Sequence, residues 1–287
     1  MYEILSNFLI KNNLQFFGVI FFKFFKLFLK NKIILDFLTF KFYAYPQKKQ
    51  LSRWMLKRLK IWDQENIEMI LRQIKNQETI FIDIGCNYGA YSIPVAKIKN
   101  LINVYCFDPS KQALKQLKAN IKLNNISNIK YFKLGIGDKK KTVYFDDIIK
   151  NHKNSGSFEI IKTKLGNKIN INSIDNLIKS KKILPCKNII IKMDIEGYEF
   201  FAMQGLQKTI NKYNIFILFE FSKKIFNNHR NLEILFSLFL KKNKLNLFDT
   251  KFSKVKIKDL CNRIKKLPKN HEVLGNYILT RYHKKIK

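Results

Sequence analysis

The stretch at residues 79–97 reads TIFIDIGCNYGAYSIPVAK, an apolar run followed by a turn and a helix-like segment. The apolar run 80–82 is typical of a buried strand, and Gly85, Asn87 and Gly89 follow it as turn-forming residues. Glycine lacks a Cβ and adopts positive φ, so a turn of this kind lets a ligand lie against bare backbone. Its form, D-x-G-x-N-x-G, differs from the dinucleotide fingerprint G-x-G-x-x-G. The stretch therefore predicts a strand, a ligand-binding turn and a helix.

Beyond this unit the chain alternates apolar runs with amphipathic segments. Further strands are expected at 103–107, 129–134, 188–193, 214–221, 245–249 and 276–281, with a short extra strand at 142–145. Helices are expected at 92–99, 111–123, 173–180, 198–210 and 232–241, the third of them capped by Ser173 or Asp175. Residues 146–170 are polar and predict a long loop. Strands that alternate with helices indicate an α/β fold with a doubly wound parallel sheet.

Candidate binding residues follow the first three expected strands. Asp83 and the glycine turn end the first, Asp108 ends the second, and Gly137 and Asp138 follow the third. In a doubly wound sheet, ligands bind beyond the carboxyl ends of the strands. A carboxylate at Asp108 can accept both hydroxyls of a ribose, and the 137–138 position suits an adenine ring. No G-K-[ST] is present, so the turn is not a phosphate loop.

Residues 189–206, IIIKMDIEGYEFFAMQGL, resemble the signature of the FkbM family of methyltransferases. In that family a strand ends I-K-x-D-x-E-G-x-E, and a helix leads to a Gly-Leu pair. Five other segments fit in order: FIDIGCNYGAYS at 81–92, FDPS at 107–110, Gly-Asp at 137–138, SGS at 155–157 and SIDNL at 173–177. The resemblance covers residues 76–221, and it departs from the family at Asp108, where Glu is commoner.

The resemblance implies a class I methyltransferase fold with a Rossmann-like seven-stranded sheet, and S-adenosylmethionine (SAM) as the methyl donor. It also implies O-methylation of a hydroxyl on a sugar or glycan. The cofactor-binding residues expected from it are Asp83, Gly85, Cys86, Asn87, Gly89, Asp108, Pro109, Gly137 and Asp138. The alternatives are a methyltransferase for a non-sugar acceptor, and an inactive basic module that binds nucleic acid or membrane. An N-P-P-Y motif, used for amide or base nitrogens, is absent from the sequence.

The candidate catalytic residues are Asp194 and Glu196, at the end of the fourth expected strand. Their i, i+2 spacing lets both face one side, and Glu220 ends the next strand. An alcohol acceptor benefits from a general base within reach. Other roles stay open: Glu196 as a helix cap, and Asp194 as a partner of the SAM amino group. Glu199 is expected on a helix surface or as an anchor, His152 is expected in a solvated loop, and no metal site is expected.

The chain has 287 residues and a formal net charge of +34. One interpretation of this charge is an anionic partner; the other is a coding bias, since lysine far outnumbers the six arginines. Sequence-specific nucleic-acid readers favour arginine, so nucleic acid is not the expected partner. The four cysteines show no C-x-x-C spacing and are expected as free thiols in the cytoplasm.

Three regions are expected along the chain: an aromatic, Lys-interrupted amphipathic extension at 1–50, a helical lead-in at 51–75, and the methyltransferase domain at 76–287. Lysines interrupt the apolar stretch 14–45 too early for a spanning helix. Two interpretations of 14–45 remain open. It lies peripherally on the inner face of the membrane, or it packs on the domain. Trp54 and Trp62 are expected to pack in the core.

Overall fold

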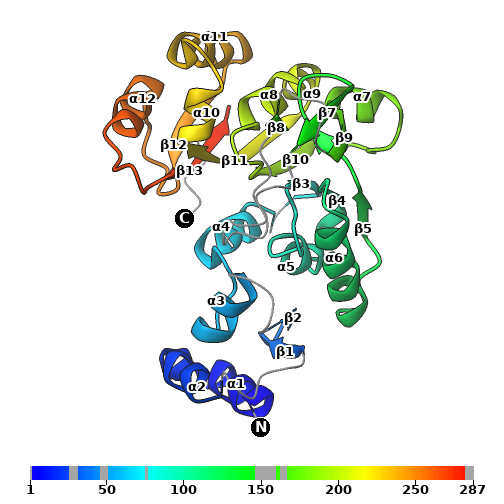
Figure 1. Cartoon of the computed structure of the whole chain (residues 1–287). Helices are drawn as coiled ribbons and strands as arrows, with labels where there is room; N and C mark the ends of the chain where they lie inside the picture. The colour runs from blue at the N-terminus through cyan, green and yellow to red at the C-terminus, as the bar shows by residue number, and fades with distance from the viewer. Residues whose placement is uncertain are drawn as a thin grey trace.

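The computed structural model describes residues 2–25, 32–45, 51–74, 77–145, 160–161 and 167–281. Their arrangement is layered, with a central sheet between helices and the N-terminal elements at one end (Figure 1). The predicted loop features His152 and Ser155-Gly156-Ser157 lie outside the described residues.

The main sheet has seven strands in the order β12-β13-β11-β10-β3-β4-β5. Five are parallel: β3 (Thr79–Ile84), β4 (Leu101–Phe107), β5 (Ile129–Phe132), β10 (Asn188–Met193) and β11 (Asn214–Ser222). β13 (Val273–Thr280) runs antiparallel to both β11 and β12 (Asn246–Asp249). The predicted seven-stranded, doubly wound sheet is confirmed, and its switch point lies between β3 and β10. It is a mixed sheet and not wholly parallel as expected, because β13 runs against both its neighbours.

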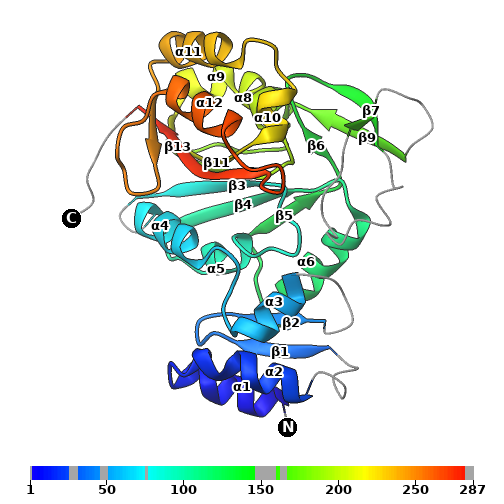
Figure 2. The same ribbon diagram turned by 60° about the vertical axis from the view of Figure 1, so that its left-hand side comes forward.

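Helices cover both faces of this sheet (Figure 2). One face carries α4 (Gln64–Ile74), α5 (Ser92–Ala96) and α6 (Lys111–Leu123). The other carries α7 (Ile174–Lys179), α8 (Glu199–Gln204), α9 (Gln207–Lys212), α10 (Lys223–Asn227), α11 (Leu232–Asn243) and α12 (Ile257–Lys265). Alternate strand residues enter the two cores, Phe81 on the α4–α6 side and Ile80 and Ile82 on the other. Every residue of β3 is buried for this reason.

The expected helix at 198–210 is two helices, α8 and α9, with a break at Gly205. A Cβ on Gly205 would lie 2.1 Å from the carbonyl oxygen of Gly137, so only glycine permits this approach of two backbones. Of the two predicted caps for α7, Ser173 is the one observed, and its hydroxyl accepts the Asn176 N–H at 3.3 Å. Asp175 instead accepts the first free N–H groups of α9, from Lys208 at 2.9 Å and Thr209 at 2.8 Å.

A second sheet was not predicted. Its order is β6-β9-β7-β8, formed by β6 (Gly135–Ile136), β7 (Lys141–Phe145), β8 (Ile160–Ile161) and β9 (Asn167–Asn172). β7 matches the expected short strand at 142–145. The loop expected through 170 ends earlier, because residues 167–170 pair with β7. Their polar side chains hid a strand whose inner residues Ile169 and Ile171 are buried.

The N-terminal extension contains helices, as expected, and also a β-hairpin. Its elements are α1 (Tyr2–Lys11), the 3-10 turn η1 (Gln15–Phe17), α2 (Gly18–Phe25) and the hairpin of β1 (Ile33–Asp36) and β2 (Lys41–Ala44). The lead-in that follows begins with α3 (Leu51–Arg58). None of the helices in the described residues is long and apolar enough to cross a membrane.

The hairpin packs on the domain through two asparagines of α6. Asn120 Oδ1 accepts the Tyr43 N–H at 3.0 Å, and Asn124 Oδ1 accepts the Lys41 N–H at 2.7 Å. Asn124 Nδ2 also donates to the Lys41 carbonyl at 2.7 Å. The helix thus offers the β2 backbone the bonds that a neighbouring strand would supply. Of the two interpretations of 14–45, packing on the domain therefore applies to its hairpin.

Candidate active site

The turn between β3 and α5 has the backbone that its glycines predict. Gly85 has φ +81°, Asn87 +49° and Gly89 +92°. A Cβ on Gly85 would lie 2.0 Å from the carbonyl oxygen of Asp194, so the turn and the end of β10 meet backbone to backbone. A side chain at this position would separate the two strand ends.

Asp108 ties the end of β4 to this turn. Its Oδ2 accepts the Asn87 N–H at 2.9 Å, and its Oδ1 accepts the Ser110 N–H at 2.8 Å. Burial raises the Asp108 pKa to about 6, against the lowering effect of these two bonds. A carboxylate has about four acceptor positions, so two remain for a diol. The geometry fits the predicted ribose contact.

Asp83 lies beneath the turn and is almost fully buried. Its Oδ2 accepts the hydroxyl of Ser92, the first residue of α5, while Oδ1 has no hydrogen-bond partner among the described residues. Burial raises the Asp83 pKa, and the charge of Lys192 acts against that shift. A buried, unpartnered carboxylate oxygen is costly, and a cationic ligand group would satisfy it.

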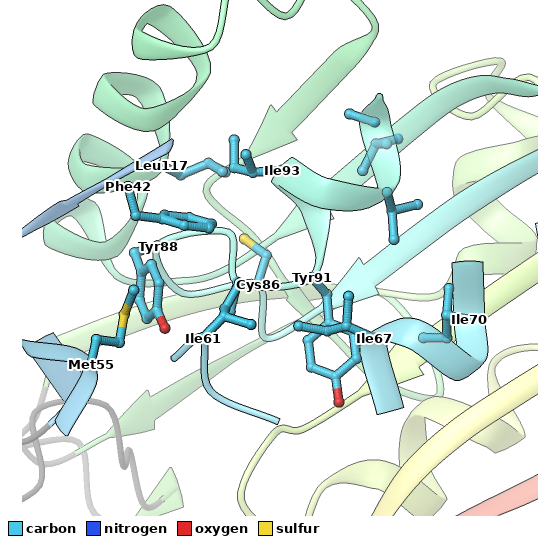
Figure 3. Packing of buried hydrophobic residues seen from close by; sticks show 14 of the residues in the cluster. Phe42, Met55, Ile61, Ile67, Ile70, Cys86, Tyr88, Tyr91, Ile93 and Leu117 are labelled. Atoms are coloured by element: carbon cyan, nitrogen blue, oxygen red, sulfur yellow. The ribbon is translucent and has the colours of Figure 1, made fainter. Parts of the chain in front are cut away.

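The side chain of Cys86 faces the hydrophobic core and not the turn's open side. It lies with Tyr88, Tyr91 and Ile61 in the cluster that joins the turn to the N-terminal region (Figure 3). Burial raises the pKa of its thiol well above the usual value. A contact between Cys86 and a cofactor would therefore involve the backbone.

Gly137 and Asp138 follow β6 in the second sheet. A Cβ on Gly137 would lie 3.0 Å from Cε1 of Tyr198, which packs against it. Asp138 forms an ion pair with Lys141 at 2.7 Å. Burial by itself would raise the Asp138 pKa, but the hydrogen bond and charge of Lys141 lower it below its usual value. The adenine contact at this position and a Pro109 contact stay predictions.

The acidic turn after β10 holds Asp194 and Glu196 in different directions. The Asp194 N–H donates to the Ile84 carbonyl at 3.0 Å, which places Asp194 directly beside the glycine turn. Glu196 has φ +56° and pairs with Lys224 of α10 at 2.9 Å. Asp194 therefore lies nearer the predicted donor position than Glu196 does.

Glu199 is fully buried, so the expected surface position is wrong and the anchor role applies. Its Oε1 accepts the Ile195 N–H at 2.8 Å, which braces the turn between Asp194 and Gly197. Burial raises the Glu199 pKa to about 8. The Glu199 side chain extends from the first turn of α8 toward the preceding turn. Helix periodicity does not predict this contact.

Lys192 is a buried site residue that the sequence reading missed. Its Nζ lies 3.1 Å from Asp194 Oδ2 and 5.1 Å from the centroid of the Tyr91 ring. Burial alone would lower the Lys192 pKa, but the charges of Asp194 and Asp83 raise it. The sequence held one sign of this role, since a single lysine interrupts the mostly apolar strand 188–193. The structure places that lysine opposite Asp83 in the register of β10 and β3.

Asp63, Asn276 and Glu220 extend this polar cluster across the sheet. The Tyr91 hydroxyl donates to Asp63 Oδ2, and Asn276 Nδ2 donates to the same oxygen at 3.3 Å. Glu220 of β11 stands opposite Asn276 in the register. Burial, helped by the charge of Asp194, raises the Glu220 pKa to about 8.

Carboxylates therefore gather at this edge of an otherwise strongly basic chain. Asp83, Asp108, Asp194 and Glu220 lie at the ends of four adjacent strands, with Lys192 among them. Such a cluster favours a cationic ligand. SAM carries a sulfonium, an ammonium and a ribose diol, and the residues present fit all three.

Comparison with known families supports this assignment. The family described as the methyltransferase FkbM domain matches residues 83–245, more than half of the chain. The protein belongs to the FkbM methyltransferase family. It is a class I methyltransferase, and its methyl donor is SAM.

This FkbM methyltransferase is also similar to curated proteins whose names specify their own substrates. A probable cobalt-precorrin-6B C(15)-methyltransferase (decarboxylating) of Methanococcus maripaludis is 28% identical over 156 residues, 54% of this chain and 75% of that protein. A tRNA(Phe) (4-demethylwyosine(37)-C(7)) aminocarboxypropyltransferase of Methanocaldococcus jannaschii is 34% identical over 71 residues, 24% of this chain and 28% of that protein.

Among solved structures, the methyltransferase FkbM from Methylobacillus flagellatus is similar at 14% identity and a TM-score of 0.42. The similarity covers 79% of this chain and 52% of that chain, so this FkbM methyltransferase spans about half the length of that structure.

Proposed function

We propose that this FkbM methyltransferase transfers the SAM methyl group to a hydroxyl on a sugar or glycan. The observation that carries the proposal is the place of Asp194, whose backbone follows β10 directly beside the Gly85 turn. Its carboxylate is held by Lys192 at 3.1 Å and is still 39% exposed. A carboxylate there can accept the proton of a hydroxyl whose oxygen approaches the donor. The enzyme's main contribution is alignment, because the donor carbon is already activated.

The donor is held by the residues of the first three strand ends. The Gly85–Gly89 backbone forms the floor, Asp108 accepts the ribose hydroxyls, and Asp83 supports the turn from beneath. The rest of the proposed SAM site is lined by Asn87, Pro109, Gly137 and Asp138. When bound, SAM supplies an electrophilic methyl carbon next to its sulfonium.

Three carboxylates are candidates for the base, and their surroundings differ. Asp194 pairs with Lys192, Glu196 pairs with Lys224, and burial raises the Glu220 pKa to about 8. We propose Asp194 as the base, because the Glu196 ion pair with α10 draws that side chain away from the turn. Lys192 holds the Asp194 carboxylate in place, which makes it a positioning residue.

Substitution of each acid by its amide separates these roles. We expect Asp194→Asn to lower kcat by about a hundredfold or more and to leave SAM binding unchanged, the usual effect of losing a general base. Glu196→Gln should change kcat little. If Glu220 were the base, kcat would instead rise with pH toward about 8 and Glu220→Gln would abolish that rise. Full turnover in Asp194→Asn would remove Asp194 from the mechanism.

The second candidate function is methyl transfer to a non-sugar acceptor. It is favoured by the cobalt-precorrin relative, whose name specifies methyl transfer to a carbon of a tetrapyrrole. The tRNA relative is named for transfer of an aminocarboxypropyl group and supports only a tRNA base as a kind of acceptor. A third alternative, an inactive basic module on the same fold, would bind its partner without needing SAM. Cytoplasmic localisation with contact at the inner face of the membrane is also part of the proposal.

Transfer of label from methyl-labelled SAM tests the acceptor class. The protein is incubated with a cell-envelope glycan fraction, with total tRNA and with a tetrapyrrole extract, each in parallel with the Asp108→Ala variant. Label in the glycan fraction that depends on Asp108 supports the proposal. Label confined to tRNA or tetrapyrrole would replace it with the second candidate. Absence of SAM binding by calorimetry would favour the inactive module.

A further inference from the structure

The outer side of the first two helices is unusually apolar for a protein surface. The exposed side chains there, called the α1–α2 apolar face, are Ile4, Phe8, Phe16, Phe17, Ile20 and Phe24. Ile4 is 76% exposed and Phe24 79% exposed. Contiguous apolar surface of this kind marks an interaction site more often than isolated exposed residues do.

The spacing of these residues puts them on one side of each helix. Ile4 and Phe8 lie four residues apart on α1, and Phe16, Ile20 and Phe24 follow the same interval through η1 and α2. The opposite sides are buried, through Tyr2 and Leu9 of α1 and Phe22 of α2. Figures 1 and 2 show the two helices at the end of the molecule beyond the hairpin, away from the main sheet.

The N-terminal sequence that carries this face is strongly basic. Residues 1–62 contain ten lysines and two arginines, but only two acids, Glu3 and Asp36. Both acids make intramolecular contacts: Glu3 Oε2 accepts the Ile34 N–H at 3.1 Å, and Asp36 pairs with Lys41 at 3.3 Å. Lys11 and Lys23, on the same two helices, are exposed.

We propose that the α1–α2 apolar face docks on an anionic lipid bilayer. Aromatic and aliphatic side chains from short helices enter the boundary between head groups and acyl chains, and flanking lysines reach the lipid phosphates. Each lysine near an anionic surface adds attraction that salt screens. A second copy of this chain is a poorer occupant, because the same positive charges would face each other.

This assignment narrows the membrane contact that was one of the two interpretations of residues 14–45. Leu35 and Phe42 of the hairpin are fully buried, so that part of the stretch does not face a membrane. The proposed contact surface keeps η1 and α2 from the stretch and adds α1. It does not depend on the identity of the methyl acceptor, since it lies away from the donor turn.

Vesicle flotation with the full chain tests the proposal. The lipid probes are phosphatidylcholine vesicles with and without phosphatidylglycerol. We expect binding to the anionic vesicles only, weakened by salt. The double variant Ile20→Ser/Phe24→Ser should reduce that binding by at least about tenfold, because two apolar side chains no longer enter the lipid. The matched control is Ile234→Ser/Leu238→Ser, which removes two equally spaced exposed side chains from α11.

A second variant keeps the test independent of any folding defect. Lys11→Glu/Lys23→Glu leaves the apolar side chains intact and should weaken binding to anionic vesicles, with thermal unfolding unchanged. Equal binding by the wild type and Ile20→Ser/Phe24→Ser would overturn the proposal, as would equal binding to neutral vesicles. A wild-type dimer in sedimentation that Ile20→Ser/Phe24→Ser converts to a monomer, with no vesicle binding, would assign the face to a second copy instead.

Discussion

Asp108 is the carboxylate proposed to bind the ribose hydroxyls of SAM. Its two oxygens already accept the Asn87 and Ser110 N–H groups, which fixes the carboxylate plane relative to the glycine turn. We expect Asp108→Asn to weaken SAM binding by roughly ten- to a hundredfold, since hydrogen bonds to a charged group contribute about 1.5–3 kcal/mol. Isothermal titration calorimetry measures this, with the exposed Asp259→Asn as the matched control.

The same residue predicts how SAM binding depends on pH. Because burial raises the Asp108 pKa to about 6, the carboxyl takes up a proton and loses acceptor positions as the pH falls below that value. SAM affinity should therefore decrease below about pH 6 in the wild type. The Asp108→Asn variant should lack this decrease, and an identical decrease in both proteins would assign it to another group.

Glu199 predicts a pH dependence of folding stability. Its pKa is raised from 4.5 to about 8 by burial, so between these values the folded state binds more protons than the unfolded state. The free energy of unfolding should then fall as the pH rises through this window. Glu199→Gln mimics the protonated carboxyl and should flatten part of the dependence, as measured by urea unfolding across this pH range. The raised pKa of Glu220 acts in the same direction, and so does that of Asp108 at the acidic end of the window.

At the scale of elements, α6 connects the extension to the donor turn. Asn120 accepts the Tyr43 N–H of β2 at 3.0 Å and donates to the Tyr88 carbonyl at 3.0 Å. One buried side chain thus bonds two segments that are distant in sequence. We expect Asn120→Ala to lower the free energy of unfolding by about 1–3 kcal/mol, because it leaves one buried and one partly buried backbone group unsatisfied.

Urea unfolding of Asn120→Ala measures this loss, and SAM titration should show weaker binding as well. Lys118→Ala, on the exposed side of the same helix, is the matched control and should change stability by less than about 0.5 kcal/mol. If Asn120→Ala and Lys118→Ala were equally stable, the Asn120 hydrogen bonds would not stabilise the hairpin, which Asn124 and the apolar contacts would then hold.

At the scale of the whole molecule, the extension and the domain share one hydrophobic cluster. Phe42 and Met55 pack with Tyr88 and Leu117 in it (Figure 3). We therefore expect residues 1–75 and the domain to unfold together in one cooperative transition.

Tryptophan provides the measurement, because both tryptophans, Trp54 and Trp62, lie in the lead-in region. Their fluorescence and the far-UV circular dichroism of the whole chain should give the same midpoint in urea. An earlier fluorescence transition would mean that the N-terminal region unfolds separately.

Trp62 shows why the burial of single side chains is hard to predict from sequence. The sequence suggested that both tryptophans pack in the core, but Trp62 is 45% exposed and contacts Trp54 edge to face. Apolar periodicity identifies a helix face, yet it does not say which neighbour covers each residue. The hairpin was missed for a similar reason, since β1 and β2 have four residues each and lie in a largely apolar, aromatic stretch without a clear alternation.

The sequence by itself determined the seven strands of the main sheet and most of the helices between them, the glycine turn, the strand-end acids and the family. These features depend on the periodicity of apolar residues and on short motif spacings, and both can be read from the order of residues alone. Only the tertiary structure decided that Lys192 pairs with Asp194, that Glu199 is buried, and that the extension packs on α6. Each of these depends on sheet register and side-chain contacts between distant segments, and such contacts exist only once the chain has folded.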